Sequence, residues 1–259
     1  MRYMPFAVAL AWGCVGGAHA SASLEALIRK ADLVLRADTA AAVIEMKVKT
    51  SSYSRTMKLV SWADDRGQTK RALIKILGPA LWRGYGTLKI GAQLKLYNPQ
   101  NDNVTVVGNS MLGDSWMGSH FTNDDLVKET RLASHYRFEQ VRTWQADAPA
   151  GGKAQYYLIN LYPKPTAPVA WGRIAYTLWQ RAGVVIPERA DYFRKANDKR
   201  PQRRFEFTNV KALAGRLLPT LMKATVTKKP GEYTTIEYKH LKLDLKIPAG
   251  KFTEQALKR

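Results

Sequence analysis

The stretch that decides the fold is Gly108-Asn-Ser-Met-Leu-Gly-Asp-Ser-Trp-Met-Gly-Ser-His-Phe-Thr-Asn-Asp-Asp-Leu126. Its apolar residues follow neither the helical nor the strand period, although alternating segments precede and follow it. Thr122 and the carboxylates after it predict an N-cap and the first turn of a short helix. The large apolar side chains before Thr122 have to be covered by the fold or by something that binds there. Two interpretations follow: a loop that caps an ordinary core, or a lid over a hydrophobic concavity.

The first twenty residues have the features of an export signal. Arg2 is followed by a short apolar run over residues 4–12 and by the cleavage pattern Ala18-His-Ala20. We therefore expect cleavage after about Ala20, a periplasmic location, and a single domain over residues 21–259. The alternative of a lipid-modified Cys14 is less favoured, because the usual leucine three positions earlier is missing. Residues 21–259 contain no cysteine, which excludes disulfides and a thiolate metal site there.

The charge of the chain is strongly basic. The formal net charge is +20, with 41 Lys and Arg against 21 Asp and Glu. Such a surface attracts anionic lipid headgroups, an acidic protein or nucleic acid, and export makes nucleic acid the least plausible of the three. The basic residues are spread along the chain, so a merely solvated surface is the competing interpretation. We expect no nucleic acid partner.

Short alternating segments predict a mainly β chain with one helix before it. Ser23 is a candidate N-cap, and apolar residues follow it at helical spacing through Leu35. Turns between the later segments are too short for crossover connections, which indicates antiparallel hairpins. A final helical turn is predicted over residues 252–257. The predicted strands cover residues 43–49, 56–62, 70–77, 85–90, 92–97, 104–107, 136–144, 153–161, 173–180, 184–195, 203–211, 218–227 and 233–247.

In the last predicted strand, the apolar residues change from even-numbered to odd-numbered positions, which lie on opposite faces of a regular strand. Ile236 and Tyr238 are at even positions, whereas Leu241 and Leu243 are at odd positions. One extra residue, a β-bulge near residues 239–241, would restore a single apolar face. A sheet of about a dozen strands also tends to curl, and the concave face of a curled sheet is the candidate binding site.

The residues that could carry catalysis are few. Three histidines follow the predicted export signal, and none has a partner at a metal-ligand spacing: His120, His135 and His240. Ser119, His120 and Asp124 would suit a lipid-processing hydrolase, but capping already explains the carboxylate and no nucleophile elbow is present. We therefore predict no catalytic residue, no metal and no cofactor.

Residues suited to binding an apolar ligand are abundant. Methionines adapt to disordered chains, and aromatic side chains supply broad apolar walls. A packed core is the competing interpretation for the same residues. The predicted cavity wall consists of Ile44, Met46, Val48, Met57, Leu59, Leu94, Leu96, Trp116, Met117, Phe121, Tyr157, Ile159, Met222 and Tyr238.

Several motifs occur in the order found in one family. They are Arg55-Thr-Met57, Leu96-Tyr-Asn-Pro99, Met117-Gly-Ser-His-Phe-Thr-Asn-Asp-Asp-Leu126, Leu218-Pro-Thr-Leu-Met222, and Phe252-Thr253 with Leu257. With them the chain resembles the LolA-like outer-membrane lipoprotein-sorting family, in its larger variant. His120 stands where that family commonly has an aspartate, and apolar residues 104–107 replace a basic segment.

The resemblance implies an unclosed antiparallel β-barrel of about 10–13 strands, covered by an N-terminal helix and a central lid. It also implies a periplasmic carrier that shields the acyl chains of a lipid or lipoprotein between the inner and outer membranes, loaded by an inner-membrane transporter. Shielding has a clear physical reason, because each buried methylene contributes about 0.8 kcal/mol. The alternative is a non-enzymatic envelope adaptor whose basic face docks on an acidic membrane protein or on an anionic lipid surface.

Overall fold

The computed structural model describes residues 16–34, 36–127, 132–167 and 169–259, and these residues form one thirteen-stranded antiparallel sheet. The strands are β1 (Thr39–Lys49), β2 (Ser54–Asp64), β3 (Arg71–Gly78), β4 (Gly86–Ile90), β5 (Gln93–Asn98), β6 (Asn103–Val106), β7 (Tyr136–Asp147), β8 (Lys153–Pro163), β9 (Arg173–Arg181), β10 (Val184–Phe193), β11 (Arg203–Leu213), β12 (Arg216–Val226) and β13 (Tyr233–Leu243). The α-helices are α1 (Gly16–Leu33), α2 (Asn123–Val127), α3 (Leu132–His135) and α4 (Glu254–Lys258). Short 3₁₀ turns are η1 (Ala80–Trp82), η2 (Asn109–Met111), η3 (Trp116–Gly118) and η4 (Ala249–Lys251). The thirteen predicted strands and the short helix after Thr122 are present, but the last strand ends at Leu243 and not at residue 247, and α3 was not predicted.

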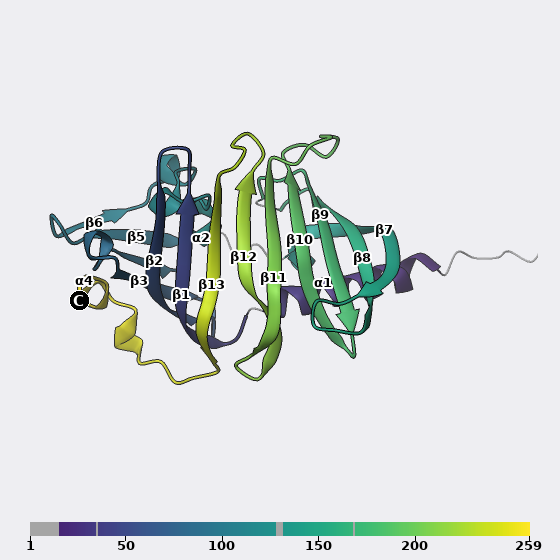
Figure 1. Ribbon diagram of the computed structural model, residues 1–259, viewed down its shortest axis with the longest axis horizontal. Coiled ribbons are helices and arrows are strands. Elements are labelled where there is room, and N and C mark those ends of the chain that lie inside the picture. Colours follow the sequence, from purple (N-terminus) through teal and green to yellow (C-terminus); the bar gives the residue numbers. More distant parts are fainter. Residues whose placement is uncertain (1–15, 35, 128–131, 168) are drawn as a thin grey trace, which may run out of the picture.

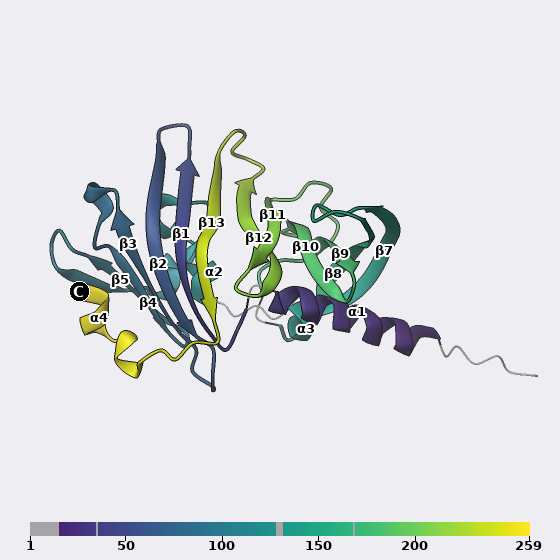
Figure 2. The same ribbon diagram turned by 60° about the horizontal axis from the view of Figure 1, so that its bottom comes forward.

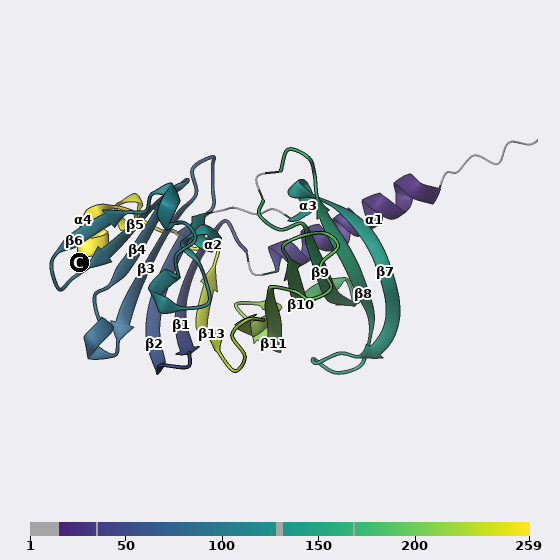
Figure 3. The same ribbon diagram turned by 90° about the horizontal axis from the view of Figure 1, so that it is seen from above.

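The sheet curls but does not close. Its strand order runs from β6 through β1 to β13 and then back down to β7, so the first strand pairs with the last (Figure 1). Strands β6 and β7 are the two edges. The curl is visible when the molecule is turned, with α1, α2 and α3 lying on the concave side (Figures 2 and 3). The predicted unclosed β-barrel is therefore confirmed.

The connection between β6 and β7 crosses the molecule. These strands are neighbours in sequence but occupy opposite edges of the sheet. The connection must therefore pass from one edge to the other, and its described residues 107–127 lie over the concave face (Figure 3). We call residues 108–126 of this connection the central loop. Its position explains why a segment without strand period carries so many large apolar side chains.

The predicted bulge in the last strand is present. Val43 of β1 pairs with His240, whereas the next residue, Ile44, pairs with Tyr238. Lys239 is therefore the extra residue of β13. The insertion keeps the apolar residues on either side of it on one face of the sheet, as their parity requires.

Helix α1 starts earlier than the sequence pattern predicts. It begins at Gly16, so Ser23 is inside the helix and is not its N-cap. The alanine and serine residues between Gly16 and Ser23 are compatible with a helical backbone, and adding residues to an existing helix costs far less free energy than nucleating one. The residues that pack on the sheet are those predicted, with Leu24, Leu27 and Ile28 buried. Across the described ranges, no helix is long and apolar enough to span a membrane.

Two apolar clusters fill most of the concave face. The first lies under α1 and α3 and includes Ile28, Tyr136 and Leu161. The second lies under the central loop and includes Met46, Met57 and Trp116. Phe205 and neighbouring aromatic residues lie where the two clusters meet. On the opposite face, the C-terminal tail packs its Phe252 and Leu257 against β3 and β4.

Candidate functional site: a cavity beside the central loop

A cavity of about 430 Å³ remains on the concave face between the two apolar clusters. This volume is within the range of roughly 300–1,000 Å³ that is usual for small-molecule sites. The cavity takes its walls from the α1 region, the central loop, α2, α3, the β8–β9 connection and strands β9 to β13. The lining residues are Ala31, Asp32, Arg36, Trp116, Phe121, Asp124, Asp125, Leu126, Leu132, Val169, Ala170, Trp171, Tyr176, Pro187, Ala190, Tyr192, Arg203, Phe205, Phe207, Met222 and Ile236.

One wall of the cavity is a row of aromatic rings from four separate segments. Trp171 lies edge-on to Tyr192, and Tyr192 lies edge-on to Phe205, with ring centroids 5.3 Å apart in both pairs. Phe205 in turn stacks on Phe121 of the central loop at 5.6 Å. Such pairs fix ring positions more firmly than area burial alone. The row therefore forms a continuous apolar surface from the β8–β9 connection to the central loop.

A buried ion pair attaches α2 to this wall. Arg203 of β11 is 6% exposed, and its Nη2 lies 2.8 Å from Oδ2 of Asp125. The guanidinium also lies over the Phe205 ring at 4.5 Å. The same Asp125 oxygen accepts a hydrogen bond from the Thr122 backbone N–H at 2.7 Å, which starts α2. One carboxylate thus both caps the helix and ties it to the sheet.

Asp32 is an acidic group in an otherwise largely apolar part of the wall. Burial raises the pKa of its carboxyl to about 6, although Arg36 and backbone hydrogen bonds from Ala133 and Leu132 oppose the shift. Burial also raises the pKa of the Tyr176 and Tyr192 hydroxyls. At neutral pH these phenols are therefore uncharged, and the carboxyl is close to its titration range.

The central loop is fixed to the sheet beside the cavity. Trp116 is 3% exposed, and its Nε1 donates to Thr87 Oγ1 at 3.0 Å. Two backbone carbonyls of the loop accept hydrogen bonds from β1–β2 hairpin residues: Met117 O from Arg55, and Gly118 O from Tyr53 Oη at 2.6 Å. Gly118 has φ +60°, and a Cβ there would lie 2.7 Å from that hydroxyl. A side chain at this position would separate the loop from the hairpin.

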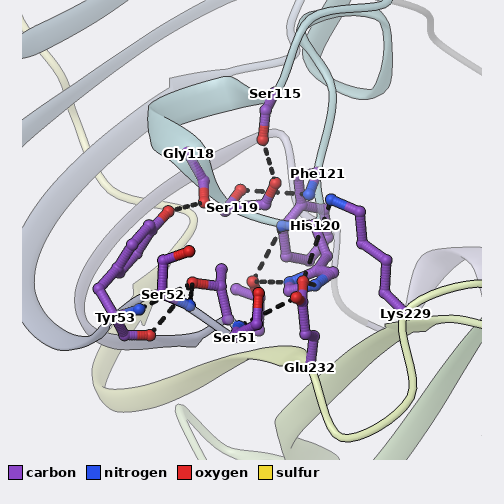
Figure 4. A network of polar contacts seen from close by, with 12 residues as sticks. Ser51, Ser52, Tyr53, Ser115, Gly118, Ser119, His120, Phe121, Lys229 and Glu232 are labelled. Atoms are coloured by element: carbon purple, nitrogen blue, oxygen red, sulfur yellow. Dashed lines mark hydrogen bonds and ion pairs between the residues drawn. The ribbon is translucent and has the colours of Figure 1, made fainter.

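His120 attaches the loop to the β12–β13 hairpin (Figure 4). Its backbone N–H donates to Thr234 Oγ1 at 2.9 Å, and its Nδ1 lies 2.9 Å from the same oxygen. Its Nε2 lies 3.5 Å from Glu232 Oε2. Burial lowers the pKa of the imidazole, although Glu232 opposes the shift. The pKa of the Glu232 carboxyl is lowered first by the Ser51 backbone N–H, which donates to it at 2.9 Å.

The Ser119–His120 pair is engaged in holding the loop. Ser119 Oγ accepts from the Phe121 backbone N–H at 3.1 Å, while the His120 ring contacts Thr234 and Glu232 instead of the serine. The geometry therefore does not assemble the nucleophile and base of a hydrolase from these two residues. In the described part of the chain, no three His, Cys, Asp or Glu residues are grouped to hold a metal.

The predicted wall residues fall into three groups. Three line the cavity: Trp116, Phe121 and Met222. Seven more pack in the cluster under the central loop: Ile44, Met46, Val48, Met57, Leu59, Leu96 and Met117. Tyr157 and Ile159 belong to the cluster under α1, Leu94 is buried in β5, and Tyr238 is half-buried on β13. Which of them touch a ligand stays a prediction.

Sequence reasoning missed the polar side of the site. Asp32 occupies a polar position of a predicted amphipathic helix, and Arg203 lies in a segment rich in basic residues, so neither residue was distinguished from a surface charge by the sequence pattern. Phe205 and Phe207 alternate on β11 and could have been found from that parity. Ile236, which shares the parity of the predicted Tyr238, could have been found in the same way.

Comparison with known proteins supports the architecture. A family model described as "Uncharacterized protein"-like matches residues 68–259, and no curated protein sequence matches the chain. A DUF1329 family protein from Desulfovibrio piger has a similar structure, with TM-score 0.76 and 19% identity over 92% of this chain and 98% of that one. So does an outer membrane lipoprotein-sorting protein domain described as putative, from Vibrio parahaemolyticus, with TM-score 0.70 and 18% identity over 91% and 97%.

The LolA superfamily protein NE2245 from Nitrosomonas europaea is a third similar structure. Its TM-score is 0.66, with 17% identity over 90% of this chain and 98% of that chain. At these identities the likeness concerns the fold. The matched family model covers well over half of the chain, from β3 through the central loop to α4. The chain belongs to the family that this model describes, and its fold is similar to those of the DUF1329 family protein and of the LolA superfamily protein NE2245.

Proposed function

We propose that the protein is a non-enzymatic periplasmic carrier that shields an acyl chain of a lipid or lipoprotein during transfer between the inner and outer membranes. The observation that carries this proposal is the cavity of about 430 Å³ with its row of aromatic rings. An acyl chain gains about 0.8 kcal/mol for each methylene that it removes from water, and it requires no directional partner. The apolar walls supply such an environment.

The similar folds add support of a different kind. Two of the related structures are described as a lipoprotein-sorting domain and a LolA superfamily protein. The leader-like residues 1–20 favour export, and a carrier in the periplasm would need a partner in the inner membrane for loading. The cargo class that we propose, an acyl lipid or lipoprotein, is what an apolar cavity with few polar groups selects.

A direct test compares ligand binding with the cavity open and filled. The protein is purified from an exporting host, its lipids are extracted for mass spectrometry, and affinity for a fluorescent fatty acid is measured. Ile236→Trp places added bulk in the cavity, whereas Thr235→Trp places the same bulk on the opposite face of β13. We expect Ile236→Trp to bind the fatty acid at least tenfold more weakly and the control to bind normally.

The result that overturns the proposal is also defined. A wild-type protein that carries no extracted acyl lipid and does not bind the fluorescent fatty acid would exclude the carrier function. Equal binding by the wild type and by a folded Ile236→Trp variant would place any lipid outside this cavity. Thermal unfolding of both variants separates loss of binding from loss of fold.

A further inference from the structure

Two neighbouring turns at one end of the sheet carry a dense group of basic side chains. The turn between β10 and β11 contributes Arg194, Lys195, Lys199 and Arg200, and the turn between β12 and β13 contributes Lys228 and Lys229. All six residues are exposed. We call them the basic rim. Both turns project from the same end of the sheet (Figures 1 and 2).

The two turns form one surface because they are bonded to each other. The Thr227 backbone N–H donates to the Gln202 carbonyl at 3.0 Å, and Thr227 Oγ1 donates to the Pro201 carbonyl. Strands β11 and β12, which lead into them, are paired along their length. The spacing of the basic groups is therefore set by the sheet.

The charge of this surface is largely uncompensated. The two turns contain two acidic residues, Asp198 and Glu232. The Asp198 carboxylate accepts a hydrogen bond from the Lys195 backbone N–H. The Glu232 carboxylate accepts a hydrogen bond from the Ser51 backbone N–H and forms an ion pair with Lys229. In the ranges that the structure describes, no carboxylate is recorded within ion-pair distance of Lys195, Lys199 or Lys228. These cations are available to an external anion.

The basic rim is joined to the wall of the cavity. Arg194 Nη1 donates to the Ala170 carbonyl at 3.1 Å, and Arg173 Nη2 donates to the Asp198 carbonyl at 2.9 Å. Ala170 lines the cavity and is itself exposed, so the cavity wall reaches the molecular surface at the point where the rim is attached.

We propose that the basic rim is a docking surface for an anionic phospholipid bilayer and that it presents the Ala170 side of the cavity to the membrane. The inference rests on the carrier function proposed above, because a bilayer is where an acyl cargo is collected or released. Each basic residue near an anionic membrane strengthens binding by about fivefold, so several together give a firm but salt-sensitive attachment. An apolar opening beside a basic patch favours a lipid surface over an acidic protein, which offers charge without acyl chains.

The experiment measures sedimentation of the full chain with vesicles. Vesicles of phosphatidylglycerol and phosphatidylcholine in equal parts are compared with vesicles of phosphatidylcholine alone, which report any apolar contribution of the leader. The rim variant combines Lys195→Gln, Lys199→Gln and Lys228→Gln. The matched control combines Lys211→Gln, Lys242→Gln and Lys246→Gln, three exposed lysines toward the other end of the sheet, and it loses the same charge.

We expect the rim variant to lose about 100-fold in affinity for the anionic vesicles and the control to stay within about threefold of wild type. Equal losses in both variants would show that diffuse charge is responsible and would overturn the proposal. Binding that does not prefer anionic vesicles would overturn it as well and would favour an acidic protein as the partner.

Fatty-acid binding by the same proteins separates this inference from the proposed function. A rim variant that keeps its affinity for the fluorescent fatty acid while losing the vesicles supports docking as a separate property. A wild-type chain that fails to bind the fatty acid but binds anionic vesicles through the rim refutes the carrier and leaves the docking surface.

Discussion

The ion pair between Arg203 and Asp125 should couple the stability of α2 to that of the sheet. The side chains are 7% and 28% exposed, and two of their atoms lie 2.8 Å apart. Breaking a fully buried pair costs about 3–5 kcal/mol, and an exposed pair contributes less than about 1 kcal/mol. For this half-buried pair we expect a coupling free energy of about 2 kcal/mol.

A double-mutant cycle measures that coupling. Arg203→Met replaces the guanidinium that lies over the Phe205 ring by an uncharged thioether, and Asp125→Asn keeps most of the volume near Thr122. Each single variant should lower the free energy of unfolding in urea by about 2 kcal/mol, and the double variant should lose clearly less than the sum. A coupling below about 0.5 kcal/mol would refute the view that this pair holds the central loop against the cavity wall.

Three further predictions concern other parts of the site. Asp32→Asn should raise the free energy of unfolding by up to roughly 3 kcal/mol at pH 7.5. The pKa of Asp32 is about 6 in the folded protein against an ordinary 3.8, so the stability of the wild type falls as pH rises between these values. Urea titrations at several pH values should show that the stability gained by the variant vanishes near pH 4. Gly118→Ala should lower the melting temperature more than Gly91→Ala, because both have positive φ but only the first directs a Cβ against Tyr53; equal losses would contradict this. Met46→Ala, at a site with no exposed surface, should cost about 2–5 kcal/mol in urea unfolding, and a loss below about 1 kcal/mol would show that the cluster repacks.

Local patterns were sufficient to predict the strands of this fold and the start of α2. Residues in a half-buried strand alternate, so each of the thirteen strands has its own signature over a few residues. The bulge at Lys239 was predictable for the same reason. When the apolar residues of one strand change from even to odd positions, one inserted residue returns them to the same face of the sheet. The start of α2 was predictable from Thr122 and the carboxylates that follow it.

The composition of the cavity could not be predicted in this way. It joins Asp32 of α1 to Arg203 of β11 and Ile236 of β13, and their proximity depends on the pairing of the first strand with the last. The pairing of β1 with β13 cannot be predicted from the sequence pattern of either strand alone. The contact of His120 with Glu232 has the same origin, since the two residues are brought together only when the connection between the edge strands crosses the sheet.

The two interpretations of the central loop, core cap and lid, apply to different parts of one segment that is hydrogen-bonded to the sheet. Trp116 is buried in the cluster over β1 to β3, whereas Phe121 belongs both to that cluster and to the aromatic row of the cavity. Hydrogen bonds through Tyr53, His120 and the Trp116 indole hold the segment along its length. A ligand would therefore meet the loop as a fixed wall, and its approach is expected where the wall is exposed, at the β8–β9 connection beside the basic rim.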